Sequence, residues 1–136
     1  MSEFGTMETE FRAKRAAGRK LLVPYITGGL PGWEHAVRAA AAAGADAIEI
    51  GIPFSDPVMD GPVIQEASQQ ALDAGATPVS ILHEARELEV GIPLAVMLYY
   101  NTVHHAGHHR FAEQLAASGI VAAIVPDLPL EEAGPW

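Results

Sequence analysis

The sequence contains no cysteine and few basic residues, and each shortage excludes classes of protein. Without cysteine there is no disulfide framework, no thiolate zinc site and no cysteine nucleophile. Eight Lys and Arg against seventeen Asp and Glu give a formal net charge of −9, which argues against a surface for nucleic acid or anionic membranes. No apolar run approaches the roughly 18 residues that span a bilayer, and no signal-peptide pattern occurs, so we expect a cytoplasmic protein.

The 136 residues suffice for one domain with a sizeable core, and 49% of them are hydrophobic. Met7 is a second candidate start, so residues 1–7 are either native or a leader placed ahead of the native sequence. We therefore assign residues 8–136 to the domain and leave residues 1–7 out of the fold prediction.

Short apolar runs alternate with segments of helical spacing along the chain. The runs are bounded by Gly or Pro and predict strands over Leu21–Thr27, Ala47–Pro53, Leu94–Tyr100 and Ala122–Leu128. The periodic segments predict helices over Glu8–Arg19, Trp33–Ala43, Val63–Ala74, Pro78–Glu89 and Gly107–Ser118. Nearly continuous apolar strands joined by helices predict an α/β fold in which helices cover a parallel sheet.

A single acidic residue, Glu49, interrupts the second predicted strand between Ile48 and Ile50. Because side chains alternate across a strand, Glu49 lies on the face opposite to both isoleucines. A buried carboxylate is costly unless it is paired or protonated. Residues 21–136 offer only three basic side chains as partners, all in or beside predicted helices: Arg38, Arg86 and Arg110. We therefore favour a functional role for Glu49 over a structural ion pair.

Two more acids, Asp56 and Asp60, follow in the Pro- and Gly-rich loop after this strand. Ligands and catalytic groups of parallel α/β folds gather at the carboxyl ends of the strands, where this loop lies. Loop aspartates also commonly form turns and cap helices. That structural interpretation is the stronger one for Asp56 from the residues alone, and for Asp60 the two interpretations are balanced.

The motifs of this loop resemble the signature of one known family, the tryptophan synthase alpha chains. The signature is carried by the run Glu49–Pro57 (EIGIPFSDP), then by Asp60-Gly61-Pro62 and Gln65. The likeness continues through Pro24–Gly29 (PYITGG), Tyr99-Tyr100-Asn101 and Val125–Pro129 (VPDLP). It covers about residues 10–136 in matching order and spacing, and so is far more specific than a lone loop motif.

The resemblance implies a lyase of tryptophan biosynthesis. Members of the family fold as a (β/α)8 barrel and cleave indole-3-glycerol phosphate to indole and glyceraldehyde 3-phosphate by a retro-aldol route. They need no metal or cofactor of their own. They form a complex with a beta chain, which carries pyridoxal phosphate and receives the indole. By this resemblance the chain is a parallel (βα)4 portion of a TIM (β/α)8 barrel, its N-terminal half.

The resemblance also implies roles for individual residues. Glu49 would be the general acid/base that protonates the indole C3 position and helps to deprotonate the glycerol hydroxyl. Asp60 would hold the indole N–H and stabilise the cation that develops. Tyr99 would line the indole pocket. Residues expected to contact the beta chain are Pro53 and Asp56 of the loop that closes on substrate, and Pro129 after the fourth strand.

The length departs from the family, because a (β/α)8 barrel needs about 250 residues. We expect four strands, without the loops after strands seven and eight that hold the substrate phosphate in such barrels. The chain is then a fragment of a longer protein, one half of a homodimer that closes a barrel, or an engineered half-barrel. One alternative function is an inactive module that only self-associates or binds the beta chain. Another is a different phosphosugar barrel enzyme such as an epimerase, although the first strand lacks the acid that would favour it.

Four histidines, at positions 104, 105, 108 and 109, have i, i+4 pairs that two metal ligands can use on a helix. No carboxylate or cysteine partner lies in the same stretch, and Gly107 weakens helical order there. We therefore predict a solvated loop and no metal site.

Overall fold

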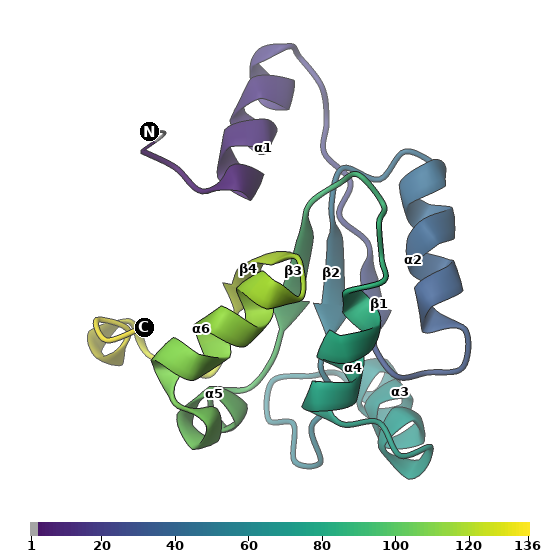
Figure 1. Cartoon of the computed structure of the whole chain (residues 1–136), viewed down its shortest axis with the longest axis vertical. Helices are drawn as coiled ribbons and strands as arrows, with labels where there is room; N and C mark the ends of the chain where they lie inside the picture. Colours follow the sequence, from purple (N-terminus) through teal and green to yellow (C-terminus); the bar gives the residue numbers. More distant parts are fainter. Residues whose placement is uncertain (1–2) are drawn as a thin grey trace.

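The computed structural model describes residues 3–136 and is built around one parallel sheet of four strands. The strands are β1 (Tyr25–Thr27), β2 (Ile48–Gly51), β3 (Leu94–Met97) and β4 (Ile120–Ile124), and they lie side by side in chain order. Figure 1 shows that they run in the same direction, with β1 and β4 at the two edges. The α/β prediction is confirmed.

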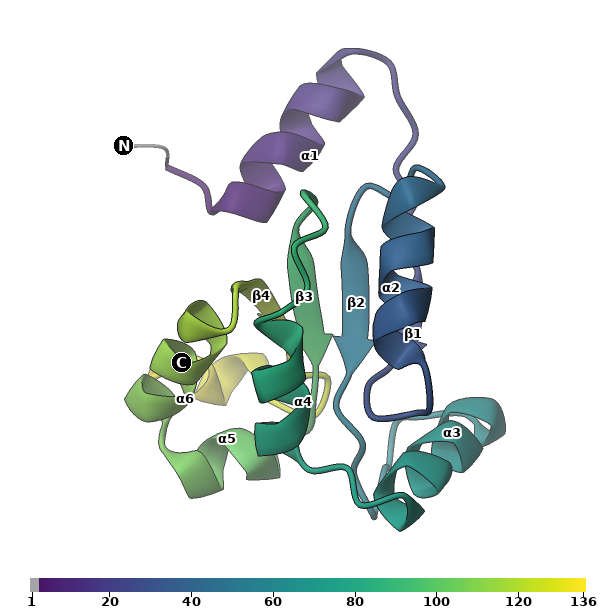
Figure 2. The same cartoon turned by 45° about the vertical axis from the view of Figure 1, so that its right-hand side comes forward.

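The part of the chain from residue 3 onward also contains six α-helices and one 3-10 turn. They are α1 (Thr6–Ala16), α2 (Trp33–Ala42), α3 (Pro62–Asp73), α4 (Pro78–Ala85), α5 (Tyr100–Ala106), α6 (His108–Ala117) and η1 (Leu130–Glu132). In Figure 2, α2, α4 and α6 lie along the sheet, while α3 and α5 lie beyond the carboxyl ends of the strands. Over residues 3–136 no helix is both long and apolar enough to cross a membrane.

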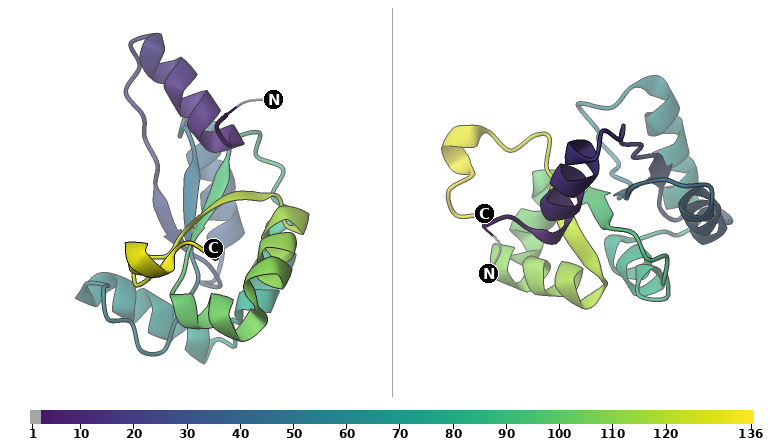
Figure 3. Two further views of the ribbon diagram at one scale, coloured as in Figure 1. Left: turned by 90° about the vertical axis from the view of Figure 1, so that its left-hand side faces the viewer. Right: turned by 90° about the horizontal axis from the view of Figure 1, so that it is seen from above.

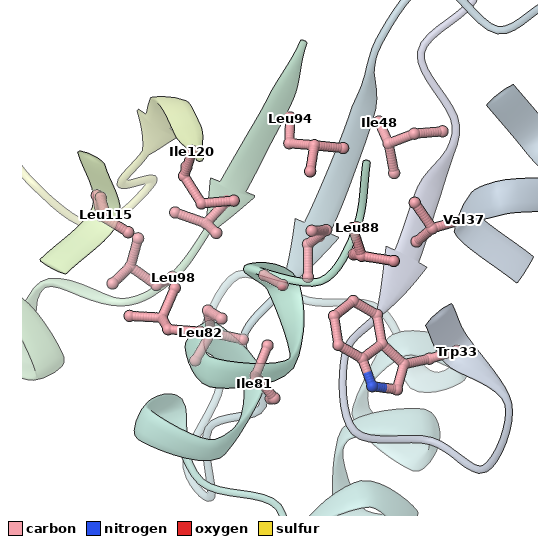
Figure 4. Packing of buried hydrophobic residues seen from close by; sticks show 14 of the residues in the cluster. Trp33, Val37, Ile48, Ile81, Leu82, Leu88, Leu94, Leu98, Leu115 and Ile120 are labelled. Carbon is pink, nitrogen blue, oxygen red and sulfur yellow. The ribbon is translucent and has the colours of Figure 1, made fainter. Parts of the chain in front are cut away.

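The core lies between the sheet and the layer formed by α2, α4 and α6. Ile48 and Ile50 of β2 have no exposed surface and pack in the same cluster as Val37 of α2, Ile81 of α4 and Leu115 of α6. Figure 4 shows Ile48, together with the labelled side chains of the three helices, between the strands and the helices. Because burial of apolar surface is the main favourable term in folding, this packing fixes which face of each strand points toward the helices.

The third strand ends earlier than predicted, and a helix missed in the sequence follows it. Strand β3 stops at Met97, and α5 begins at Tyr100, whose N–H donates to the Asp127 carboxylate at 2.8 Å. Gly107, with a φ of 86°, separates α5 from α6. The predicted solvated loop around the histidines is therefore wrong, because all four lie in these two helices.

Other boundaries differ by a few residues. The register shifts between Leu94 and Ala95, and β4 begins at Ile120 rather than at Ala122. Of the residues set aside as a leader, Met1 and Ser2 lie outside the described residues, whereas Thr6 and Met7 belong to α1.

Helix α1 lies beyond the amino ends of the strands, as Figure 3 shows. An ion pair between Lys14 of this helix and Asp46 holds it there. The Asp46 carboxylate forms ion pairs with Lys14 Nζ at 3.0 Å and with Arg19 Nη2 at 3.1 Å. It also accepts a hydrogen bond from the Leu22 N–H at 2.8 Å. The hydrogen bond from Leu22, followed by the one from Lys14, holds the pKa of Asp46 below its ordinary value. Asp46 thus ties the helix and the chain that enters β1 to the start of β2.

Replacing Ile81 tests the core. Ile81→Ala should lower the free energy of unfolding by about 2–5 kcal/mol, because it leaves a cavity at a side chain with no exposed surface. Val79→Ala on the same helix is the matched control: Val79 is 71% exposed, and its loss should change the value by less than about 0.5 kcal/mol. Equal effects in urea denaturation would contradict this description of the core.

Replacing Asp46 tests the anchor of α1 through its pH dependence. Because the pKa of Asp46 is lower in the folded chain, its stabilisation is present above the ordinary Asp pKa of about 3.9 and is lost as the pH falls through the folded value. Asp46→Asn should therefore be less stable than the parent at neutral pH, and the gap should close in acid. Urea denaturation at stepped pH measures it, with exposed Glu89→Gln as control. A gap that persists in acid would argue against the ion pairs as its cause.

Candidate active site

Glu49 lies on the face of the sheet that the α2, α4 and α6 layer leaves uncovered. Its neighbours Ile48 and Ile50 are fully buried toward the helices, whereas Glu49 is half-buried on the other side, as the alternation predicted. The parallel register places Tyr25 of β1 and Ala95 of β3 directly beside it. We call this surface the inner face, since it would line the interior of a closed barrel.

The carboxyl group of Glu49 has no ion-pair or hydrogen-bond partner among residues 3–136. Arg38, one of the possible partners, instead donates to the main-chain carbonyl of Glu87 at 3.1 Å. Burial alone raises the pKa of Glu49, because apolar surroundings disfavour the charged form. A carboxyl group with a raised pKa holds its proton closer to neutral pH, as a general acid requires.

Asp60 lies in the loop between β2 and α3, near the same end of the inner face. The N-cap of α3 is Gly61, and no side chain caps that helix, so Asp60 does not serve as its cap. The Asp60 main-chain carbonyl accepts a hydrogen bond from Gln65 Nε2 at 2.8 Å. Its side chain is half-buried, and its charge contributes to raised pKa values at both Tyr25 and Tyr99. The charges of Asp60 and Glu49 therefore both influence the region around Tyr25.

Tyr99, at the end of β3, holds the loop that carries Asp60. Its hydroxyl accepts the Met59 N–H at 3.0 Å, and its ring stacks on Phe54 with centroids 5.2 Å apart. The side chain is 2% exposed, and burial followed by the charge of Asp60 raises its pKa. Tyr99 thus contacts both ends of the loop, and its expected place in a substrate pocket stays a prediction.

Tyr25 is a residue of this region that the sequence reasoning missed. It lies opposite Glu49 in the β1–β2 ladder, and burial, then the nearby charges of Asp60 and Glu49, raise its pKa. A hydrogen bond from the Thr27 side chain acts in the opposite direction. The signal was available, because alternation along Tyr25-Ile26-Thr27 places both polar side chains on the face opposite Ile26.

The three residues expected to meet a beta chain have different surroundings. Asp56 is exposed and accepts a hydrogen bond from the Ser55 hydroxyl at 2.8 Å. Pro53 is buried at the start of the same loop, and Pro129 is exposed at the N-cap of η1. Their expected contact with a partner stays a prediction.

Two of the four histidines of α5 and α6, His104 and His108, contact the Tyr100 ring. His108 Nε2 lies 2.7 Å from the Tyr100 hydroxyl, and His109 pairs with Glu113 of the same helix at 3.1 Å. The His108 ring also meets Trp136 edge-on, with centroids 5.8 Å apart. Across residues 3–136, no group of three His, Cys, Asp or Glu side chains is arranged to hold a metal ion.

Known proteins match this chain over almost all of its length. The family model described as tryptophan synthase alpha chain matches residues 11–136. The tryptophan synthase alpha chain of Halorhodospira halophila is 48% identical over 130 residues, and that of Alkalilimnicola ehrlichii is 46% identical over 136. These matches cover 91% and 96% of this chain but only 48% and 50% of the relatives. The chain spans about half the length of the curated relatives that it matches.

Solved structures give the same result for the fold. Tryptophan synthase from M. tuberculosis superposes with a TM-score of 0.91 at 36% identity, covering 98% of this chain and 55% of that one. The alpha subunit from Legionella pneumophila gives a TM-score of 0.90 at 34% identity, with 96% and 52% covered. The four-stranded sheet is thus the predicted (βα)4 portion of a TIM (β/α)8 barrel. The chain belongs to the tryptophan synthase alpha chain family.

Proposed function

We propose that this chain carries the proton-transfer residues of a lyase that cleaves indole-3-glycerol phosphate to indole and glyceraldehyde 3-phosphate. The observation that supports the proposal best is the setting of Glu49, an unpaired, half-buried carboxyl group with a raised pKa on the inner face. Asp60 lies close enough for its charge to act on the same tyrosines. Because the chain spans about half of its relatives, the activity is proposed for a completed barrel.

Glu49 would act first as an acid and then as a base. Its neutral form donates a proton to C3 of the indole ring, which makes the ring a cationic leaving group. The resulting carboxylate accepts the proton of the hydroxyl on the glycerol carbon that is bonded to C3. The bond between C3 and this carbon then breaks, the carbon becomes that of the aldehyde, and the bonding electrons return to the ring, which leaves as neutral indole. A raised pKa suits this cycle, because both forms must be accessible near neutral pH.

Asp60 would stabilise the positive charge that develops on the indole nitrogen. An ionised carboxylate in a loop can accept the indole N–H and lower the energy of the cation. The strand residue Glu49 and the loop residue Asp60 would thus divide the work according to their surroundings, as pairs of carboxylates in other enzymes do.

We propose a beta chain as the partner of this chain, and no metal or cofactor held by the chain itself. Pyridoxal phosphate would belong to the beta chain, which would receive the indole. Asp56 and Pro129 expose side chains that such a partner could contact, and Pro53 would support the loop from beneath. We expect the complex in the cytoplasm.

An assembly module without chemistry is the second candidate, and the edges of the sheet favour it. Strands β1 and β4 each have one neighbour within the sheet, and Val121 and Ile124 of β4 are each 44% exposed. Unpaired edges and exposed apolar side chains favour association, either with a second copy as a homodimer of half-barrels or with a beta chain. The epimerase alternative is disfavoured, since β1 carries no acid and the family is that of the lyase.

Replacing Glu49 in a completed barrel tests the lyase. The chain would be mixed with the C-terminal half of the Halorhodospira halophila relative, and indole release from indole-3-glycerol phosphate would be followed. Glu49→Gln should lower turnover by about 10²–10⁴-fold, the usual contribution of a general acid or base. Exposed Glu66→Gln is the matched control and should leave it unchanged.

Each outcome separates the candidates. Near-normal turnover in Glu49→Gln would contradict the role of Glu49 as general acid and base. Tight binding to a beta chain or to a second copy, with no indole released by any assembly, would favour the assembly module.

Replacing Tyr99 tests its hold on the loop. Tyr99→Phe keeps the ring on Phe54 and removes the acceptor of the Met59 N–H, so unfolding should become easier by about 0.5–1.5 kcal/mol. Amide exchange at Met59 should become faster. Tyr100→Phe is the matched control, because it removes a hydroxyl that contacts His108 and not the loop. Unchanged exchange at Met59 in Tyr99→Phe would show that the loop is held by other contacts.

A further inference from the structure

The ring of Tyr25 lies directly against Gly51, on the strand next to its own. A Cβ added to Gly51 would overlap the hydroxyl and the ring atoms of Tyr25. Gly51 is thus needed for space, and its φ is not in the left-handed region. In the ladder, Tyr25 pairs with Glu49 and Thr27 pairs with Gly51, so the ring extends along the inner face past Glu49 toward the carboxyl end of β2.

Beside Glu49 itself the large side chain is that of Tyr25, whereas Met97, two residues further along β3 on the same face and 8% exposed, pairs with Gly51. Strand β3 contributes Ala95 directly opposite, and the corresponding position on β4 is Ala122. Among the described residues, the titratable groups on this part of the inner face are Tyr25 on β1, Asp60 in the loop and Tyr99 after β3. Of the two side chains paired with Glu49, Tyr25 is therefore the one large enough to cover the Glu49 carboxyl group.

We propose that Tyr25 is a positioning residue for Glu49: its ring, seated on Gly51, shields the Glu49 carboxyl group, and its hydroxyl faces the space between Glu49 and Asp60. The catalytic meaning of this arrangement rests on the proposed function, whereas the shielding itself does not. Shielding by the ring accounts for the burial that raises the pKa of Glu49.

The hydroxyl gives the site a donor between two acceptors. The phenol oxygen carries one proton that it can donate. Burial and the charges of Asp60 and Glu49 raise the pKa of Tyr25, so the phenol stays neutral and keeps that proton. Tyrosine supplies both functions here, and phenylalanine would supply only the shield.

The test is the titration of the Glu49 carboxyl carbon by 13C NMR in the 136-residue chain, without substrate. Tyr25→Ala should shift the midpoint of Glu49 to lower pH, toward that of an ordinary glutamate, because water reaches the carboxyl group. Tyr25→Phe keeps the ring and should stay close to the parent. Gly51→Ala should behave like Tyr25→Ala, because the added methyl group displaces the ring without removing it. The exposed Glu89 carboxyl group is the internal control and should titrate alike in all variants.

The variants distinguish the two proposals. An unchanged Glu49 midpoint in Tyr25→Ala, with a parent-like circular dichroism spectrum, would overturn the role of Tyr25. If Tyr25→Ala does not fold, Gly51→Ala replaces it: an unchanged Glu49 midpoint in a folded Gly51→Ala chain would likewise overturn the role of Tyr25. A shift as expected, together with no indole release from any completed barrel, would leave the shielding intact and contradict the lyase.

Discussion

Burial of one face of the sheet against α2, α4 and α6 is the constraint on which the other features depend. Ile48 and Ile50 have no exposed surface, and a slip of one residue in register would bring them to the opposite face. The same alternation places Glu49 on the inner face, where no basic group of residues 3–136 pairs with it. The position of the candidate acid is therefore a consequence of core packing, and its raised pKa follows from that position.

The site combines this rigid strand with a loop that is held separately. Glu49 is fixed by the ladders on both sides of β2, whereas Asp60 depends on the hold of Tyr99 on Phe54 and Met59. Side chains on paired strands keep their positions better than those on loops. This division would let the loop move while Glu49 keeps its place on the sheet.

What the sequence could predict was local or periodic. Alternation located Glu49, and the helix predicted from Pro78 onward begins there as α4, where the Thr77 side chain accepts from the Ser80 N–H. Helix α5 could not be found in this way, because its first N–H is satisfied by Asp127, a residue 27 positions later. The contact of Tyr25 with Gly51 depends on the register of two strands, which local patterns do not give. The family motifs pointed to Asp60, but only the loop geometry shows that Gly61, rather than Asp60, caps α3.

Closure of the sheet into a barrel and the pKa of Glu49 are coupled by the same surface. The inner face carries Glu49 between apolar and small side chains, and its edge at β4 exposes Val121 and Ile124. Covering this face would bury apolar area, which favours association by about 25 cal/mol per Å² before the cost of ordering. The same cover would remove water from Glu49 and raise its pKa further, because only burial shifts it in the chain as it stands. A second copy or the other half of a barrel would therefore raise the pKa of Glu49 when it completes the sheet.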